Sequence, residues 1–139
     1  MARFGDQRTY SFDGQPLGES VHLGIDLAST AHATVQAANH GVVVFADYLG
    51  IYGNMVILDH GLGITSLYSH LNDIAVKAGQ QVSKGDALGT TGTTGLAGGD
   101  HLHFSVLVGG RFVNPIEWWD PHWLKDNVED KMSDAVALL

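Results

Sequence analysis

Two pairs of side chains in this chain have the types and spacing of metal ligands. His101 and His103 are separated by one residue in GGDHLHFSV, and His22 and Asp26 are four residues apart in VHLGIDLA. Zinc is bound by imidazole, carboxylate or thiolate groups, and the chain has no cysteine. A catalytic zinc site uses three protein ligands and leaves the remaining position to water. His22, Asp26 and one histidine of the other pair would satisfy that count.

The sequence around each of the other histidines predicts its role or its exposure to solvent. His70, in LYSHL, alternates with polar residues and is a further candidate for chemistry. His32 and His40 lie in or beside expected turns and are predicted to be solvated. His60 precedes a glycine turn, where a structural hydrogen bond to the backbone is expected. His122 starts the C-terminal segment and is predicted to be exposed.

The two candidate pairs lie on segments whose alternation is typical of half-buried strands. Residues 21–28 place Val21, Leu23, Ile25 and Leu27 on one face, with His22 and Asp26 on the other. Residues 101–108 alternate in the same way, so that His101 and His103 share one face and apolar residues share the opposite one. Each strand is therefore expected to bury an apolar face and to carry its metal-capable pair on the other.

Further apolar runs predict strands over residues 34–38, 41–48, 54–60 and 65–71, separated by glycine-containing turns. In the segment 76–89, valine, glycine or leucine recurs every three residues, which predicts the tight turns of a small hammerhead-like barrel. The small residues of 90–99 predict a loop that leads to His101.

The C-terminal segment differs in kind. Asp120 followed by Pro121 is typical of an N-cap and a first helical position. An apolar residue then recurs at every fourth position (Leu124, Val128, Met132 and Val136). We expect a short helix from about residue 121 to the mid-130s, either docked on the domain or leading into a linker.

Composition favours one turn-rich, mainly β domain. The chain has 139 residues, 45% hydrophobic content, 18 glycines and only 16% charged residues. Its 7 basic against 15 acidic residues give a net charge of -8, which disfavours nucleic acid as a partner, because binding phosphates requires Lys and Arg. The apolar stretches are far shorter than the roughly 20 residues of a membrane span.

Three motifs in order, HLGIDLA, LYSHL and HLHF, resemble those of the LytM/lysostaphin-type zinc metalloendopeptidases, which cut peptide bonds in bacterial peptidoglycan. The resemblance runs from about residues 4–8 to 113–119 and includes YGNMVILDHG, VKAGQQVSKGDALGTTGTTG and Asn114-Pro115. It implies a mostly antiparallel β-sheet core with a groove walled by loops. It also implies a catalytic domain over residues 1–119, followed by a C-terminal helix or tail over 120–139.

The resemblance implies that His22, Asp26 and His103 hold one zinc ion per chain, and that His70 and His101 are the catalytic histidines. No His-Glu-x-x-His motif supplies a glutamate base. Neutral His101 is therefore expected to accept the proton of the attacking water, with His70 at the developing oxyanion, or the two roles exchanged. Asp100 stands where this family often has proline, and this carboxylate could hydrogen-bond a histidine or alter the charge of the groove.

The implied partners are stem peptides or cross-bridges of peptidoglycan. This substrate predicts an exported domain, periplasmic or associated with the cell wall, whose signal or anchor is not in this chain. The sequence does not distinguish cleavage of glycine bridges from cleavage of D-alanine–diaminopimelate cross-links.

Three alternatives stay open at this point. A non-catalytic relative could regulate other wall hydrolases, although such proteins typically lack zinc ligands that this chain retains. The segment 76–89 also resembles biotinyl or lipoyl barrels and phosphocarrier domains, in which facing histidines act without a ligand such as Asp26. Lastly, the histidines could lie on the surface of a binding module.

Overall fold

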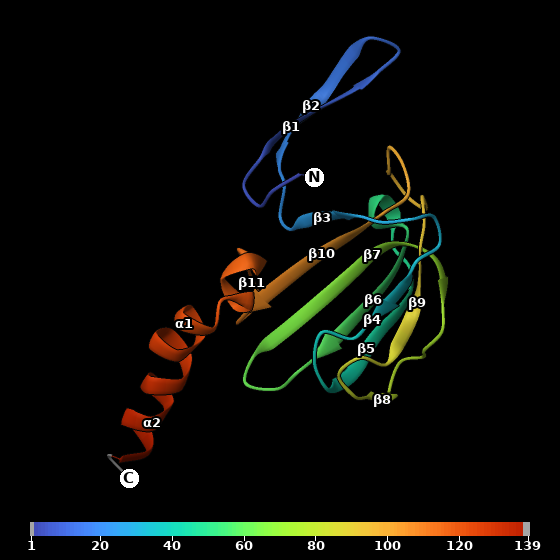
Figure 1. Ribbon diagram of the computed structural model, residues 1–139. Helices are drawn as coiled ribbons and strands as arrows, with labels where there is room; N and C mark the ends of the chain where they lie inside the picture. The colour runs from blue at the N-terminus through green and yellow to red at the C-terminus, as the bar shows by residue number, and fades with distance from the viewer. Residues whose placement is uncertain (1, 138–139) are drawn as a thin grey trace.

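The computed structural model describes residues 2–137, and antiparallel pairing dominates its architecture (Figure 1). Nine strands form one sheet in which β11, β10, β7, β6, β5 and β8 follow one another, while β3 pairs with β10, and β9 pairs with both β4 and β7. The bounds of these strands are β3 (Ile25–Ala28), β4 (Thr34–Gln36), β5 (Gly41–Tyr48), β6 (Asn54–Asp59), β7 (Ile64–Ile74), β8 (Gln81–Val82), β9 (Ala87–Thr91), β10 (His101–Val108) and β11 (Arg111–Val113). The predicted antiparallel, mainly β fold is confirmed.

Most of the predicted strands form close to their predicted bounds. β5 covers 41–48 as expected, β6 ends one residue early, and β7 extends to residue 74. The segment 76–89 contains β8 and the start of β9. A tight turn precedes β8, closed by Gln80 N donating to Lys77 O (3.1 Å), and another joins β8 to β9, closed by Asp86 N donating to Ser83 O (3.0 Å). The core between these strands is apolar and centres on Val56, Leu58, Tyr68, Leu71, Leu88 and Phe104.

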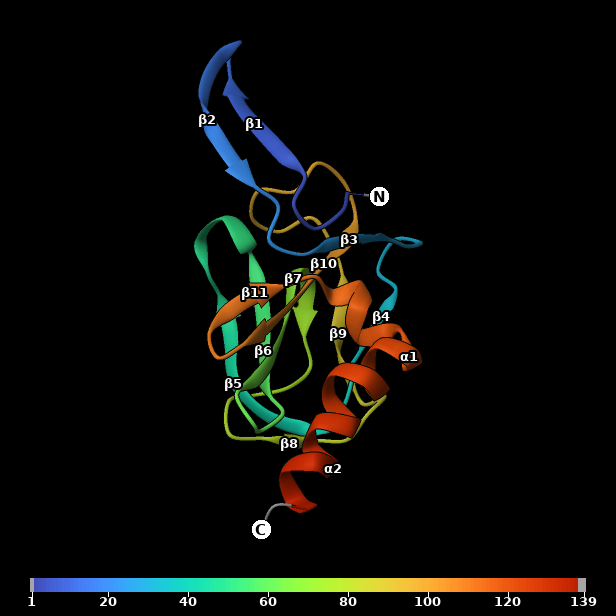
Figure 2. The same cartoon turned by 90° about the vertical axis from the view of Figure 1, so that its left-hand side faces the viewer.

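A separate hairpin projects from the end of the sheet where β3 pairs with β10 (Figures 1 and 2). It is formed by β1 (Gln7–Phe12) and β2 (Gln15–Val21), joined through Asp13 and Gly14, whose φ angles of 49° and 76° suit a tight hairpin turn. Its base is anchored to the chain that follows β2, because His22 N donates to Asp6 O (2.8 Å) and Gly5 N donates to His22 O (2.9 Å).

The prediction of one continuous strand over residues 21–28 is wrong. β2 ends at Val21, β3 begins at Ile25, and the residues between them leave the sheet. Val21 and Leu23 are 47% and 37% exposed, whereas His22 is only 3% exposed, the reverse of the predicted faces. The reason is that the backbone of His22 bonds to the N-terminal segment instead of to a neighbouring strand.

The C-terminal helix is present as predicted and runs away from the sheet (Figures 1 and 2). It consists of α1 (Pro121–Leu124), a π-helical segment η3 (Lys125–Glu129) and α2 (Asp130–Ala137), and Asp120 caps it by accepting from His122 N at 2.9 Å. The short helix η2 (Pro115–Trp119) connects it to the sheet, with Trp119 stacked 5.9 Å from Phe104. Met132 and Val136, in the distal half of the predicted stripe, are exposed.

No helix within residues 2–137 is both long and apolar enough to cross a bilayer. Residues 1, 138 and 139, which fall within the predicted ranges 1–119 and 120–139, lie outside the described part of the chain.

Candidate active site

Strand register brings the candidate residues together at one end of the sheet. His103 on β10 lies opposite Asp26 on β3 and, on its other side, opposite Ser69 on β7. His70 follows Ser69, and His22 reaches the same point from the loop that joins the hairpin to β3. Three segments distant in the sequence therefore deliver imidazole and carboxylate groups to one place.

Three of these side chains form a compact triangle of donor atoms. His22 Nε2 lies 2.9 Å from His103 Nδ1 and 3.1 Å from Asp26 Oδ1, and the last two atoms are 3.0 Å apart. Ligands at about 2.0–2.1 Å from a tetrahedral zinc ion are separated by roughly 3.3 Å. The triangle therefore has nearly the dimensions of one face of such a tetrahedron, and its two imidazole nitrogens and one carboxylate oxygen are donors that zinc accepts.

The outer nitrogens of these two imidazoles have partners that orient them. His22 donates its Nδ1–H to Arg3 O at 2.8 Å, which leaves the lone pair of Nε2 facing the triangle. His103 Nε2 lies 3.1 Å from Ser105 Oγ, a hydroxyl that can accept from Nε2–H when Nδ1 binds a metal and can donate to Nε2 when Nδ1–H is donated to Asp26. The carbonyl of Arg3 thus fixes His22 in the tautomer that metal binding requires, and the Ser105 hydroxyl permits that tautomer for His103.

Gly24, between His22 and Asp26, permits the close approach of this loop to β10. A Cβ at this position would lie 2.4 Å from Phe104 O and 2.9 Å from the His103 ring carbon Cε1. Any other residue would therefore push the segment carrying His22 and Asp26 away from His103.

His70 is held beside the triangle in an unusual backbone conformation. Its φ of 61° is in the left-handed region, which non-glycine residues seldom occupy outside functional or strained positions. The ring donates Nδ1–H to Thr94 O at 2.8 Å. Thr94 is itself fixed, since its hydroxyl donates to Leu71 O (2.6 Å) and accepts from Asn54 N (3.0 Å).

His101 completes the group on the more exposed side. Its Nδ1–H donates to Gly99 O at 2.7 Å, and its Nε2 lies 3.6 Å from Asp26 Oδ1. The rings of His70 and His101 are 4.9 Å apart, centroid to centroid. In both rings Nδ1–H donates to a backbone carbonyl, so Nε2 carries the lone pair that can accept a proton.

Burial and charge set the protonation states of the site. Burial lowers the pKa of His22 and of His70, so both imidazoles are neutral at neutral pH. Burial alone would raise the pKa of Asp26, but hydrogen bonds from His103 and Arg8 and the nearby positive charge outweigh it and hold that pKa well below its usual range. Of the proposed ligands, His22 is therefore neutral and Asp26 ionised at neutral pH, the states in which these groups bind a divalent metal ion.

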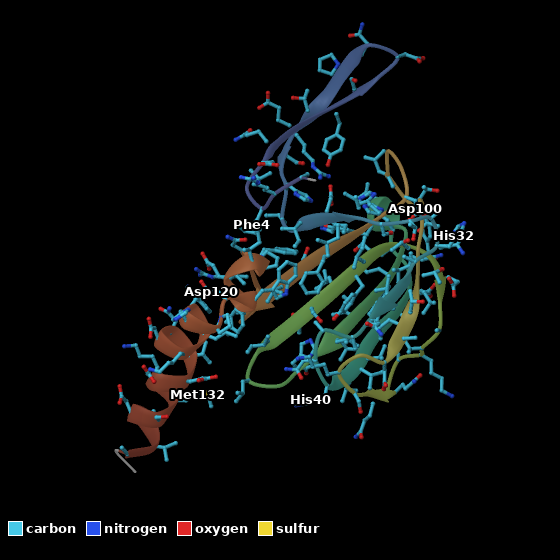
Figure 3. The ribbon with its side chains drawn as sticks, viewed as in Figure 1. Phe4, His32, His40, Asp100, Asp120 and Met132 are labelled. Carbon is cyan, nitrogen blue, oxygen red and sulfur yellow. The ribbon has the colours of Figure 1, made fainter. Side chains whose placement is uncertain are left out.

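The remaining histidines lie apart from the triangle. His60 donates Nδ1–H to His40 O at 2.7 Å, so the structural hydrogen bond predicted for it is confirmed. His32, His40 and His122 are exposed, as predicted. Asp100 lies beside His32, whose backbone N–H donates to its carboxylate at 3.2 Å (Figure 3), and this is the contact of Asp100 with a histidine that the sequence suggested.

A cleft of about 160 Å³ opens over the triangle. Its walls include three residues that sequence analysis did not single out: Arg8 and Tyr10 of the hairpin and Tyr52 of η1 (Gly50–Tyr52). Leu96, in the small-residue loop, also lines it and ties that loop to η1 through its N–H, which donates to Ile51 O at 2.8 Å. The predicted loop-walled groove is thus present, with the hairpin as an additional wall.

Known proteins with the same sequence pattern and fold include peptidases. The chain is 40% identical over 96 residues to the peptidoglycan DD-endopeptidase ShyA of Vibrio cholerae, a match that covers 69% of this chain and 22% of that protein. The chain thus spans about a fifth of the length of this curated relative.

Two solved structures show the same fold. A zinc-containing peptidase from Vibrio cholerae superposes with a TM-score of 0.70 at 33% identity, covering 81% of this chain and 34% of the other. The catalytic domain of lysostaphin from Staphylococcus simulans gives a TM-score of 0.72 at 25% identity, covering 85% and 89% of the two chains. Residues 20–115, which include all five clustered residues, match peptidase family M23, and the chain belongs to that family.

Proposed function

We propose that residues 1–119 form the catalytic domain of a zinc endopeptidase that hydrolyses peptide cross-links of bacterial peptidoglycan. The observation that carries the proposal is the donor triangle of His22, Asp26 and His103, with His70 lining the same cleft and the His101 ring 4.9 Å from that of His70. Membership of family M23 and the similarity to a peptidoglycan DD-endopeptidase support the reaction and the substrate. A phosphocarrier role has less support, because it gives no function to an ionised carboxylate between the histidines.

His22, Asp26 and His103 would hold one zinc ion per chain, which fits the spacing of their donor atoms and the tautomer of His22. When bound there, zinc supplies Lewis-acid polarisation of the scissile carbonyl and makes the attacking water more acidic. Asp26 contributes one negative charge, so the site keeps a net positive charge with which to attract the carbonyl oxygen.

His101 is the proposed general base. Its Nε2 is an acceptor in the neutral ring and lies 3.6 Å from Asp26 Oδ1, beside the position of the reacting groups. After it takes the proton of the attacking water, the imidazolium can donate that proton to the departing amine.

His70 is proposed to orient the same water. Since its Nδ1–H is donated to Thr94 O, its neutral ring offers only an acceptor at Nε2, and an oxyanion needs a donor. Burial lowers the pKa of His70 and so disfavours the protonated form that could donate there. The orienting role therefore has more support than the oxyanion role expected from the sequence.

Peptidoglycan lies outside the cytoplasmic membrane of bacteria, so the proposed substrate implies an exported protein that acts in the periplasm or at the cell wall. The partners are then stem peptides or cross-bridges.

The test is digestion of purified peptidoglycan with glycine-bridged and with diaminopimelate cross-links, followed by mass analysis of the fragments. We expect cross-linked dimers to be converted to monomers by peptide-bond cleavage. The activity should disappear with a chelator and return with zinc. His101→Ala should be inactive, and His122→Ala, at an exposed histidine, should be a fully active control. Cleavage in the glycan alone, or no cleavage by the zinc-loaded protein, would contradict the proposal.

A further inference from the structure

Arg8 is a cleft residue whose role the proposed reaction does not yet explain. Its guanidinium pairs through Nη2 with Asp26 Oδ2, while the other oxygen of the same carboxylate faces His22 and His103. The Arg8 side chain is 29% exposed, so it is largely withdrawn from water but still reaches the cleft. Arg8 therefore places a permanent positive charge next to the proposed metal site, with the Asp26 carboxylate between the two.

The guanidinium has hydrogen-bonding capacity to spare. Arginine presents several N–H donors in a planar fork, and within residues 2–137 the Arg8 side chain donates only to Asp26. Among the described residues that line the cleft, Arg8 is the only lysine or arginine, in a chain whose net charge is -8. A ligand that enters the cleft thus meets a guanidinium that is paired with Asp26 and still has N–H donors left over.

The hairpin holds Arg8 in place and is not a loose arm. Arg8 on β1 lies opposite Ser20 on β2, which also lines the cleft. The base of the hairpin is bonded to the backbone of His22, one of the proposed ligands, through Asp6 O at 2.8 Å. The position of Arg8 is therefore coupled to that of the triangle, as a preorganised binding group requires.

We propose that Arg8 is a specificity-determining residue that binds a free carboxylate on the residue following the scissile amide. The inference rests on the proposed function and says which cross-links the site takes. In a D-alanine–diaminopimelate cross-link, the carbon that bears the scissile nitrogen also bears a carboxylate. In a glycine bridge the same position carries another neutral amide. A guanidinium fork beside the reaction centre can bind the carboxylate bidentately as an ion pair, whereas the neutral amide offers a carbonyl acceptor without the charge.

The test uses two cross-linked peptide dimers that differ only at this group, a free carboxylate in one and a primary amide in the other. The zinc-loaded wild type should hydrolyse the acid with a kcat/KM about 10- to 100-fold higher, mainly through KM, the range expected for a hydrogen-bonded charge. Arg8→Gln should remove this preference while retaining about one zinc per chain, and Arg8→Lys should restore part of it. Arg111→Gln, at an exposed arginine on β11, is the matched control and should keep the full preference.

If Arg8 had a purely structural role, such as orienting Asp26, Arg8→Gln would hydrolyse both dimers more slowly and by the same factor. That outcome, or a wild type that does not discriminate between the dimers, would overturn the inference. Binding of both dimers to zinc-loaded His101→Ala protein, with and without Arg8→Gln, is measured by calorimetry in parallel. If the wild type hydrolyses neither dimer, the proposed function fails, and the calorimetry alone decides on Arg8. Tighter binding of the acid that depends on Arg8 supports the inference, and equal binding refutes it.

Discussion

Replacing Gly24 by alanine is expected to separate the proposed ligands from one another. The added Cβ would lie 2.4 Å from Phe104 O, 2.5 Å from Ser105 Oγ and 2.9 Å from His103 Cε1. Ordinary contacts of this kind are about 3.5 Å or longer, so the loop must retreat from β10 by about 1 Å. No left-handed φ is involved at Gly24, so the effect isolates this steric contact.

A shift of this size is several times larger than the tolerance of a metal site, which is about 0.2 Å in ligand distance. We therefore expect Gly24→Ala to weaken zinc binding by about 10- to 100-fold or more. Loss of a residue that only supports the ligands already has an effect of this size. The zinc-free protein should also lose about 1–3 kcal/mol of unfolding free energy, as overpacked sites do.

Zinc affinity is measured by competition with a chromogenic chelator, and stability by urea unfolding of the zinc-free protein. Gly98→Ala is the matched control, because a Cβ there would meet nothing within 4 Å and the backbone is not left-handed. Its unfolding free energy should stay within about 0.5 kcal/mol of wild type. If Gly24→Ala equals wild type in both measurements, the close packing of this loop on β10 is not what aligns the site.

Two further predictions concern the histidines. Burial lowers the pKa of His22 and His70 in the folded state, so these histidines bind protons more readily in the unfolded chain. The unfolding free energy of the zinc-free protein should therefore fall as the pH drops below about 6.5, and should level off below the pKa values of the folded state. Urea unfolding between about pH 5 and pH 8 measures this, and a flat profile would contradict it. Thr94→Val removes the two hydrogen bonds of the Thr94 hydroxyl, to Leu71 O and from Asn54 N. The Thr94 carbonyl that accepts from the His70 ring is then less well fixed, so turnover should fall about 10- to 100-fold while the zinc content stays unchanged. Steady-state assays and metal analysis check this, and loss of zinc would place Thr94 in the metal site instead.

Local patterns predicted those parts of the fold that depend on local contacts. Alternation placed His101 and His103 on one side of β10, because side chains in a strand alternate and both neighbouring strands preserve the register. The Asp120–Pro121 pair predicted the helix start, because its capping bond joins residues two apart. The three motifs HLGIDLA, LYSHL and HLHF, in this order along the chain, were enough to indicate the family.

Features that depend on distant contacts were not readable from the sequence. The break after Val21 arises because His22 bonds to Asp6 and Gly5, which an alternating pattern cannot reveal. Arg8 enters the cleft only because the hairpin brings it against Asp26, 18 residues further along the chain. The orientation of the His70 ring depends on Thr94, a residue 24 positions away, and the left-handed backbone of His70 has no signal in the sequence.

The central claim, that His103 binds the metal and His101 does not, is tested most directly by the zinc content of two alanine variants. His103 Nδ1 lies 2.9 Å and 3.0 Å from the other two donor atoms, whereas His101 Nε2 lies 3.6 Å from Asp26 Oδ1. After dialysis against buffer with trace zinc, atomic spectroscopy should find about one zinc per chain in His101→Ala and little in His103→Ala. Zinc retained by His103→Ala and lost by His101→Ala would mean that the metal lies on the other side of Asp26, with the two histidines of β10 in reversed roles.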